Sequence, residues 1–153
     1  GGLAAAVKHA RNGVSPSIYH NDHSNPSNPK IRSLQEEISR VIRGRATNPK
    51  WIKGVMRHGY KGAFEIAATL DYLFAFAATT NAVKNYHFDQ LFEAYFEDND
   101  VREFIGRANP YALKEMAARF REAVDRGLWQ PRSNHYSSVL SEILEIPTKG
   151  NMP

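Results

Sequence analysis

Apolar residues recur at helical spacing along most of this chain. Leu34, Ile38, Val41 and Ile42 lie three or four positions apart, and a helix brings such positions to one face. The same spacing predicts helices over 3–11, 34–42, 49–58, 62–80, 88–96, 101–105, 110–126 and 139–144. Residues 17–20 fit a short strand. The fold class is therefore mainly α: an irregular helical bundle, with at most one or two short strands near the N-terminus.

The segment 63–80 differs from the others because it is apolar nearly all round. One of its faces carries Phe64, Ala67, Ala68, Ala75 and Ala78. A helix of this kind belongs at the centre of a domain, so we expect a buried core helix. The aromatic residues at helical spacing are expected in the same core: Phe74, Phe76, Phe88, Phe92 and Tyr95.

Helix ends are marked by short capping patterns. Ser33 with Glu36 fits a capping box, and Asn48 precedes a proline that suits the first helical position. Asn109 precedes a proline in the same way. Gly59 is expected to end the helix that Asn48 begins.

The length of 153 residues suits one helical domain spanning 1–153 and is too short for two. The chain opens with Gly-Gly-Leu and no methionine, which suggests a piece of a larger protein. It has no cysteine, so disulfides, thiolate metal sites and cysteine nucleophiles are excluded, and the composition suits a reducing cytoplasm. No apolar run is long enough to predict a membrane span.

The net charge of +4 is unevenly distributed. Residues 30–61 hold nine Lys and Arg against two Glu, a net charge of +7, which leaves −3 for the rest of the chain. A basic stripe of this kind indicates a contact surface for an anionic partner. Nucleic acid, a polycarboxylate ligand and an acidic protein all fit that description.

Two imidazoles and a carboxylate fall within four residues at His20, Asp22 and His23. These groups suit divalent first-row metals such as cobalt, nickel or zinc. The spacing matches no known metal cage, and a polar turn in which Asp22 caps a backbone N–H explains the residues equally well.

The segment 57–62 packs titratable groups around two glycines. Arg57 and Lys61 can hold carboxylates, and His58 can move protons near neutral pH. The glycines allow a close backbone approach or left-handed dihedral angles. The alternative is structural: a glycine that ends a helix, followed by an ordinary ion pair between Lys61 and Glu65.

Asp71 stands inside the apolar segment, where a carboxylate needs a partner or a raised pKa. A structural pair, with an arginine of the basic stripe as its partner, is the favoured interpretation over a catalytic carboxylate. The chain has no phosphate-binding glycine loop, nucleophile elbow, HExxH or paired CxxC. Any ATP used must therefore bind to another polypeptide.

Residues 48–80 resemble the C-terminal region of the large subunit of aerobic cobaltochelatase, whose paralogue is the large subunit of magnesium chelatase. The resemblance extends to the opening 1–7, the loop 19–22, the segment 31–37 and the stretches 108–110, 126–129 and 131–134. Magnesium relatives tend to have Gly-Tyr-Glu-Gly where this chain has Gly59-Tyr60-Lys61-Gly62. These residues, together with Phe76 where the magnesium relatives have tryptophan, resemble the cobaltochelatase branch of the family.

The resemblance implies a subunit that binds the tetrapyrrole and the metal while AAA+ ATPase subunits consume ATP with Mg²⁺. Its substrates would be Co²⁺ and hydrogenobyrinic acid a,c-diamide, whose carboxylates suit the basic stripe. Metallation needs a group that removes the ring N–H protons and a ligand that delivers the metal. On this basis Asp22 and His20 would be the metal or proton site.

The remaining assignments follow the same implication, and we expect no nucleic acid and no membrane as partner. The metal ligands would be Asp22, His20 and His23; the catalytic residues Asp22, His20, His58 and Glu65; and the substrate-binding residues Arg57, Tyr60, Lys61, Lys50 and Trp51. Alternatives are a magnesium chelatase acting on protoporphyrin and a non-catalytic helical module that docks the ATPase or binds nucleic acid through 30–61. No groove-reading motif supports nucleic acid.

Overall fold

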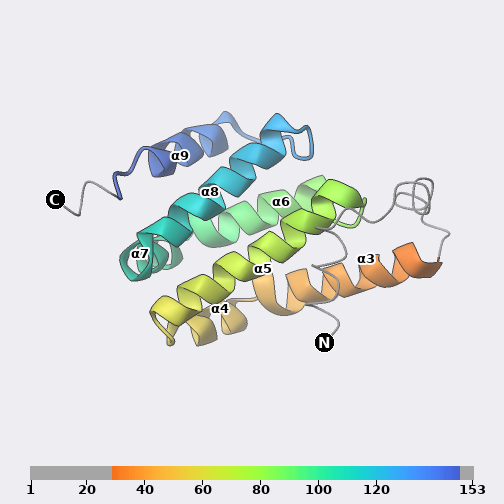
Figure 1. Cartoon of the computed structure of the whole chain (residues 1–153), viewed down its shortest axis with the longest axis horizontal. Coiled ribbons are helices and arrows are strands. Elements are labelled where there is room, and N and C mark those ends of the chain that lie inside the picture. Colours follow the sequence, from red (N-terminus) through yellow and green to blue (C-terminus); the bar gives the residue numbers. More distant parts are fainter. Residues whose placement is uncertain (1–28, 149–153) are drawn as a thin grey trace.

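The computed structural model describes residues 29–148, and these form helices joined by short turns (Figure 1). The elements are α3 (Pro29–Val41), the π-helical turn η1 (Ile42–Ala46), α4 (Pro49–Met56), α5 (Tyr60–Thr79), α6 (Asn85–Phe92), the π-helical turn η2 (Glu93–Glu97), α7 (Asn99–Ala108), α8 (Pro110–Asp125) and α9 (Asn134–Leu144). The mainly α fold class is confirmed, with no strand among these residues. The strand predicted at 17–20 lies outside the described residues.

Helix α5 lies between α8 on one side and α3 with α4 on the other (Figure 1). Helices α3 and α8 contact it through identified side chains. Tyr72 donates a hydrogen bond to Glu37 of α3 (3.3 Å), and the ring of Phe74 meets that of Phe120 of α8 edge to face at 5.0 Å. One continuous hydrophobic cluster joins all these elements. The predicted central position of this helix follows from that packing.

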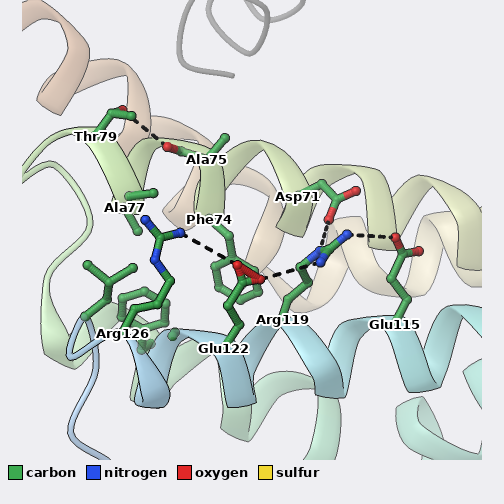
Figure 2. A pocket seen from close by; sticks show the side chains of 13 residues that line it. Asp71, Phe74, Ala75, Ala77, Thr79, Glu115, Arg119, Glu122 and Arg126 are labelled. Carbon is green, nitrogen blue, oxygen red and sulfur yellow. Dashed lines mark hydrogen bonds and ion pairs between the residues drawn. The ribbon is translucent and has the colours of Figure 1, made fainter. Parts of the chain in front are cut away.

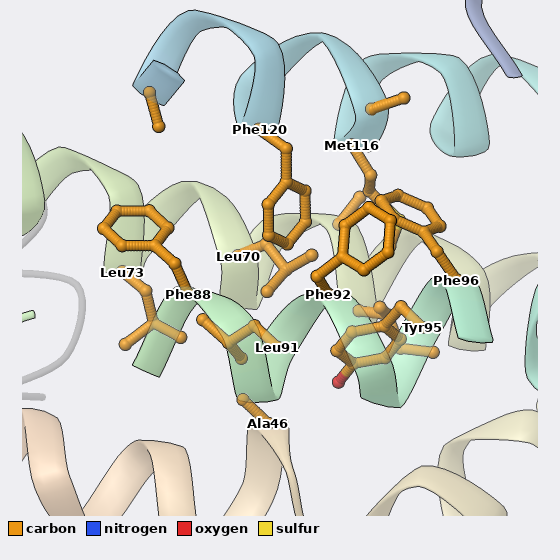
Figure 3. Packing of buried hydrophobic residues seen from close by; sticks show 14 of the residues in the cluster. Ala46, Leu70, Leu73, Phe88, Leu91, Phe92, Tyr95, Phe96, Met116 and Phe120 are labelled. Carbon is orange, nitrogen blue, oxygen red and sulfur yellow. The ribbon is translucent and has the colours of Figure 1, made fainter. Parts of the chain in front are cut away.

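Aromatic rings fill the core between α5, α6, η2 and α8 (Figure 3). Phe92 packs edge to face with Phe96 at 5.2 Å and with Phe120 at 5.8 Å. Four of the five aromatic residues predicted as core are at most 1% exposed: Phe76, Phe88, Phe92 and Tyr95. The fifth, Phe74, is half-buried and stacks on Phe88 at 5.5 Å.

Helix α5 is a core helix, but one strip of its surface is exposed. Phe64 is 62% exposed and Ala68 is exposed, although Ala67 beside them is buried. The reason is geometric: α3 and α4 cover one flank of α5 and α8 the other, which leaves a strip between them uncovered. Within residues 29–148, no helix combines the length and hydropathy that a membrane span requires.

The structure confirms the two Asn-Pro caps and corrects the third. The Asn48 side chain accepts a hydrogen bond from the Lys50 N–H (2.9 Å), and Asn109 does the same for the N–H of Ala112 (3.2 Å). Ser33 is no cap, because α3 already begins at Pro29, four residues earlier. A proline suits the first turn of a helix, so Pro29 serves as a start signal and Ser33 lies within the helix.

Candidate functional site

The turn between α4 and α5, residues 57–62, has a backbone that only glycine supplies at two positions. Gly59 has a φ of 57° and a ψ of −128°, a conformation that side chains disfavour. Gly62 faces α4 so closely that a Cβ placed on it would lie 1.8 Å from the Val55 carbonyl oxygen. Both predicted roles of these glycines, a left-handed φ and a close approach, are confirmed.

Backbone hydrogen bonds fix this corner on both sides. The N–H groups of His58 and Gly59 donate to Val55 and Met56 at 2.9 and 3.3 Å, and that of Ala63 donates to Gly59 at 3.0 Å. No hinge separates the two helices. The side chains that leave the corner therefore project from a fixed frame.

The structure brings most of the predicted site residues in the described range together at this corner. Arg57, His58, Lys61 and Glu65 are exposed, and Tyr60 is 63% exposed. Among the described residues, Lys61 and Glu65 form no ion pair, so the structural alternative of an i,i+4 pair is not realised. The cationic groups of the corner are open to a ligand.

Two predicted substrate-binding residues lie at the other end of α4. Lys50 is exposed, whereas Trp51 is half-buried and packs against the hydrophobic core. Seven residues of helix separate Lys50 from Arg57, about 10 Å along the axis. Further cations of the basic stripe are exposed along α3, η1 and α4: Arg32, Arg40, Arg43, Arg45 and Lys53.

The predicted metal ligands His20, Asp22 and His23 lie outside the described residues. Between residues 29 and 148, no group of three or more His, Asp or Glu side chains is arranged to hold a metal ion. His58 and Glu65 accordingly stand at the corner without the further ligands that a metal centre needs.

Asp71 is part of an ion-pair network on the surface between α5 and α8 (Figure 2). Its Oδ1 lies 3.2 Å from Nε of Arg119, and that guanidinium also lies 3.5 Å from Glu115 and 3.6 Å from Glu122. The predicted structural role of Asp71 is thus confirmed, but its expected partner was wrong. The arginine comes from α8 and not from the basic stripe, because α8 is the helix that packs beside this turn of α5.

A cavity of about 450 Å³ adjoins this network, and sequence reasoning missed it. Its lining combines apolar residues, among them Phe74 and Phe88, with charged side chains. Figure 2 shows Phe74 close to the charged side chains of Arg119 and Glu122. Three carboxylates and two guanidinium groups line it: Asp71, Glu115, Glu122, Arg119 and Arg126. The charged residues at i, i+4 and i+7 of α8 were the available signal, but nothing local showed that they face α5.

Two titratable groups in the core, Tyr72 and His87, have displaced pKa values and structural partners. Burial raises the pKa of Tyr72, and the neighbouring Glu37 raises it further. Burial also lowers the pKa of His87, with a smaller effect from Lys84. His87 Nδ1 accepts the Lys84 N–H at 2.9 Å and so holds the turn before α6. These groups stabilise the bundle and lie apart from the corner.

Comparison with known proteins assigns this chain to a family. The family described as CobN/Magnesium Chelatase matches residues 1–136. The chain belongs to this family. It is 60% identical to the aerobic cobaltochelatase subunit CobN of a Sinorhizobium species over 97% of its length, and 34% identical to the H-type subunit of magnesium chelatase from Rhodobacter capsulatus over 86%.

A solved structure agrees with the sequence relatives. The catalytic subunit of cobaltochelatase from Mycobacterium tuberculosis superposes with a TM-score of 0.70 at 44% identity, over 72% of this chain. That match covers 10% of the solved chain, and this chain spans 12% of the Sinorhizobium protein and 11% of the Rhodobacter one. The similarity therefore concerns one part of much longer subunits.

Proposed function

We propose that this chain is the tetrapyrrole- and metal-binding part of an ATP-dependent cobaltochelatase large subunit. The reaction would insert Co²⁺ into hydrogenobyrinic acid a,c-diamide during cobalamin synthesis in the cytoplasm. Support comes from the identity to CobN of 60%, against 34% to the magnesium-chelatase relative from Rhodobacter. Lys61, in place of the glutamate of the magnesium branch, favours the same assignment.

The observation that carries the proposal is the charge at the α4–α5 corner. Arg57 and Lys61 are exposed at the corner and Lys50 and Lys53 along α4, with Glu65 as the nearby carboxylate, a net charge of +3. The cavity between α5 and α8 has three carboxylates against two guanidinium groups, a net charge of −1. A polycarboxylate ligand is attracted to the corner and repelled from the cavity.

Each residue then has a role that its chemistry can perform. Arg57 can bind a carboxylate of the ring through two N–H groups, and Lys61 can act as a point charge beside it. His58 and Glu65 are the groups that can accept the N–H protons released on metallation. Lys50, Trp51 and Tyr60 would line the same side of the ligand.

Metal delivery is assigned to the N-terminal residues Asp22, His20 and His23. Their carboxylate and imidazole groups suit Co²⁺. We propose that the AAA+ ATPase subunits bind ATP and Mg²⁺, because this sequence contains no phosphate-binding loop.

The test is ring binding by the full-length subunit, followed through the absorbance of hydrogenobyrinic acid a,c-diamide. Arg57→Ala and Lys61→Ala should each weaken binding about tenfold, because each removes a charge-assisted hydrogen bond. The matched control is Arg107→Ala, which removes an exposed cation at the end of α7. Asp22→Ala should abolish cobalt insertion and leave ring binding intact. Unchanged binding by both corner variants would refute the proposed site.

The magnesium alternative is tested in the same assay with protoporphyrin and Mg²⁺. The 34% identity to a magnesium-chelatase relative is the observation that favours it. Tighter binding of protoporphyrin than of the corrinoid would reverse our choice of substrate. If substitutions at both Arg57 and Asp22 left ring binding unchanged, the result would instead favour a scaffold that docks the ATPase.

A further inference from the structure

The uncovered strip of α5 begins with two exposed aromatic side chains, Tyr60 and Phe64. They are 63% and 62% exposed, and they lie one helical turn apart, about 6 Å along the axis. At about 100° per residue, their directions differ by only about 40°. Ala68, one turn further, is exposed on the same side. We call Tyr60 and Phe64 the aromatic ridge.

The packing of α5 does not explain why these rings lie outside the core. Ala63 and Ile66, on other faces of the same turns, are fully buried, so this end of α5 is well packed. An aromatic side chain in water forgoes the stabilisation that burial would give it. Two such side chains side by side are characteristic of a binding surface.

The charges beside the ridge indicate what it binds. Lys61 lies about 60° around the helix from Phe64, and Arg57 comes three residues before Tyr60 on the corner. An apolar ridge flanked by cations is complementary to a molecule that has a flat apolar face and an anionic rim. Tetrapyrroles with side-chain carboxylates have both features, whereas an acidic peptide lacks the flat face.

We propose that the aromatic ridge is a stacking platform for the face of the tetrapyrrole. This inference rests on the proposed function and adds Phe64 to that site, beneath the ring, with Tyr60 towards the edge of the ring. Carboxylates on the rim then reach Lys61 and Arg57. The ridge is convex, so it supplies one wall of the site, and the opposite wall comes from elsewhere in the full-length protein.

The experiment is a titration of the full-length subunit with hydrogenobyrinic acid a,c-diamide. Phe64→Ala should raise the Kd about tenfold, the effect of losing one ring–ring contact. Phe64→Trp should keep the Kd within about twofold, and its indole fluorescence should be quenched when the ring binds. Quenching of that indole requires proximity, which a merely structural role would not produce.

The matched control is Tyr86→Ala. Tyr86 is 58% exposed and lies in the first turn of α6, two residues before Phe88. Phe88 stacks on Phe74, which lies about 15 Å along α5 from Phe64. Its removal should leave the Kd unchanged. A Kd that rises equally for Tyr86→Ala and Phe64→Ala would overturn the proposal.

The outcomes separate this inference from the proposed function. If Lys61→Ala weakens binding and Phe64→Ala does not, the platform is overturned and the proposed function stands. If Arg57→Ala, Lys61→Ala and Phe64→Ala all leave binding unchanged, both are overturned. If Phe64→Ala leaves the Kd unchanged and impairs assembly with the ATPase subunits, the ridge is a protein-docking surface and the stacking proposal is wrong.

Discussion

Replacement of Gly62 by alanine should destabilise the chain through the contact between α4 and α5. The added Cβ would lie 1.8 Å from the Val55 carbonyl oxygen and 2.8 Å from its carbonyl carbon, whereas Cβ contacts below 3.0 Å essentially do not occur. The obstacle is backbone, so no side chain can rotate away. The two helices must separate locally by about 1.2 Å, the difference between 1.8 Å and 3.0 Å.

The magnitude follows from two opposing terms. Overpacking costs about 1–3 kcal/mol, and the severity of this contact puts it at the upper end. Alanine is favoured over glycine within a helix by about 0.5–1 kcal/mol. The net loss in the free energy of unfolding is about 2 kcal/mol, which for a chain of this size lowers the Tm by about 4–8 °C.

The assay is thermal unfolding of the 153-residue chain followed by circular dichroism. Gly54→Ala is the matched control, because Gly54 lies within α4 and a Cβ there meets nothing within 4 Å. That variant should raise the Tm by about 2–4 °C. A Tm for Gly62→Ala equal to that of the wild type would refute the reasoning. In the full-length subunit, Gly62→Ala should also weaken ring binding, since it displaces Lys61.

Three further predictions concern the core and the ion-pair network of Asp71. Tyr95→Phe should stabilise the chain by about 1 kcal/mol in chemical denaturation, because the buried hydroxyl has no hydrogen-bond partner among the described residues; a loss of stability would contradict this. Asp71→Asn should cost about 1 kcal/mol because the pair with Arg119 is partly exposed, and a double-mutant cycle with no coupling between them would show the pair to be inert. His87 has a folded-state pKa below its ordinary 6.5, so its stabilising effect is complete above about pH 6.5 and declines as the pH falls towards the folded-state value. Between about pH 7.5 and 5.5, the Tm of the wild type should therefore fall further than the Tm of His87→Asn. Equal falls in Tm would argue against a stabilising role of neutral His87.

Within residues 29–148, local sequence predicted the helices and the corner between α4 and α5 well, whereas the helix predicted over 3–11 lies outside the described residues. Asn48 and Asn109 cap their helices because a cap needs only a side-chain oxygen and an N–H two or three residues later. Gly59 and Gly62 mark the corner because glycine alone tolerates its dihedral angles and its close contact. Features of this kind depend on residues within one or two turns, so the amino-acid sequence determines them directly.

The tertiary structure decided the features that depend on neighbouring helices. Phe64 belongs to an apolar run, yet it faces outward because α3, α4 and α8 leave that strip of α5 uncovered. Asp71 needed a partner, and the arrangement of α5 and α8 supplied Arg119, which lies 48 residues away in the sequence. The same arrangement forms the cavity above Phe74. Periodicity shows that a residue lies on a particular face of a helix, but only the packing of the other helices determines what that face meets.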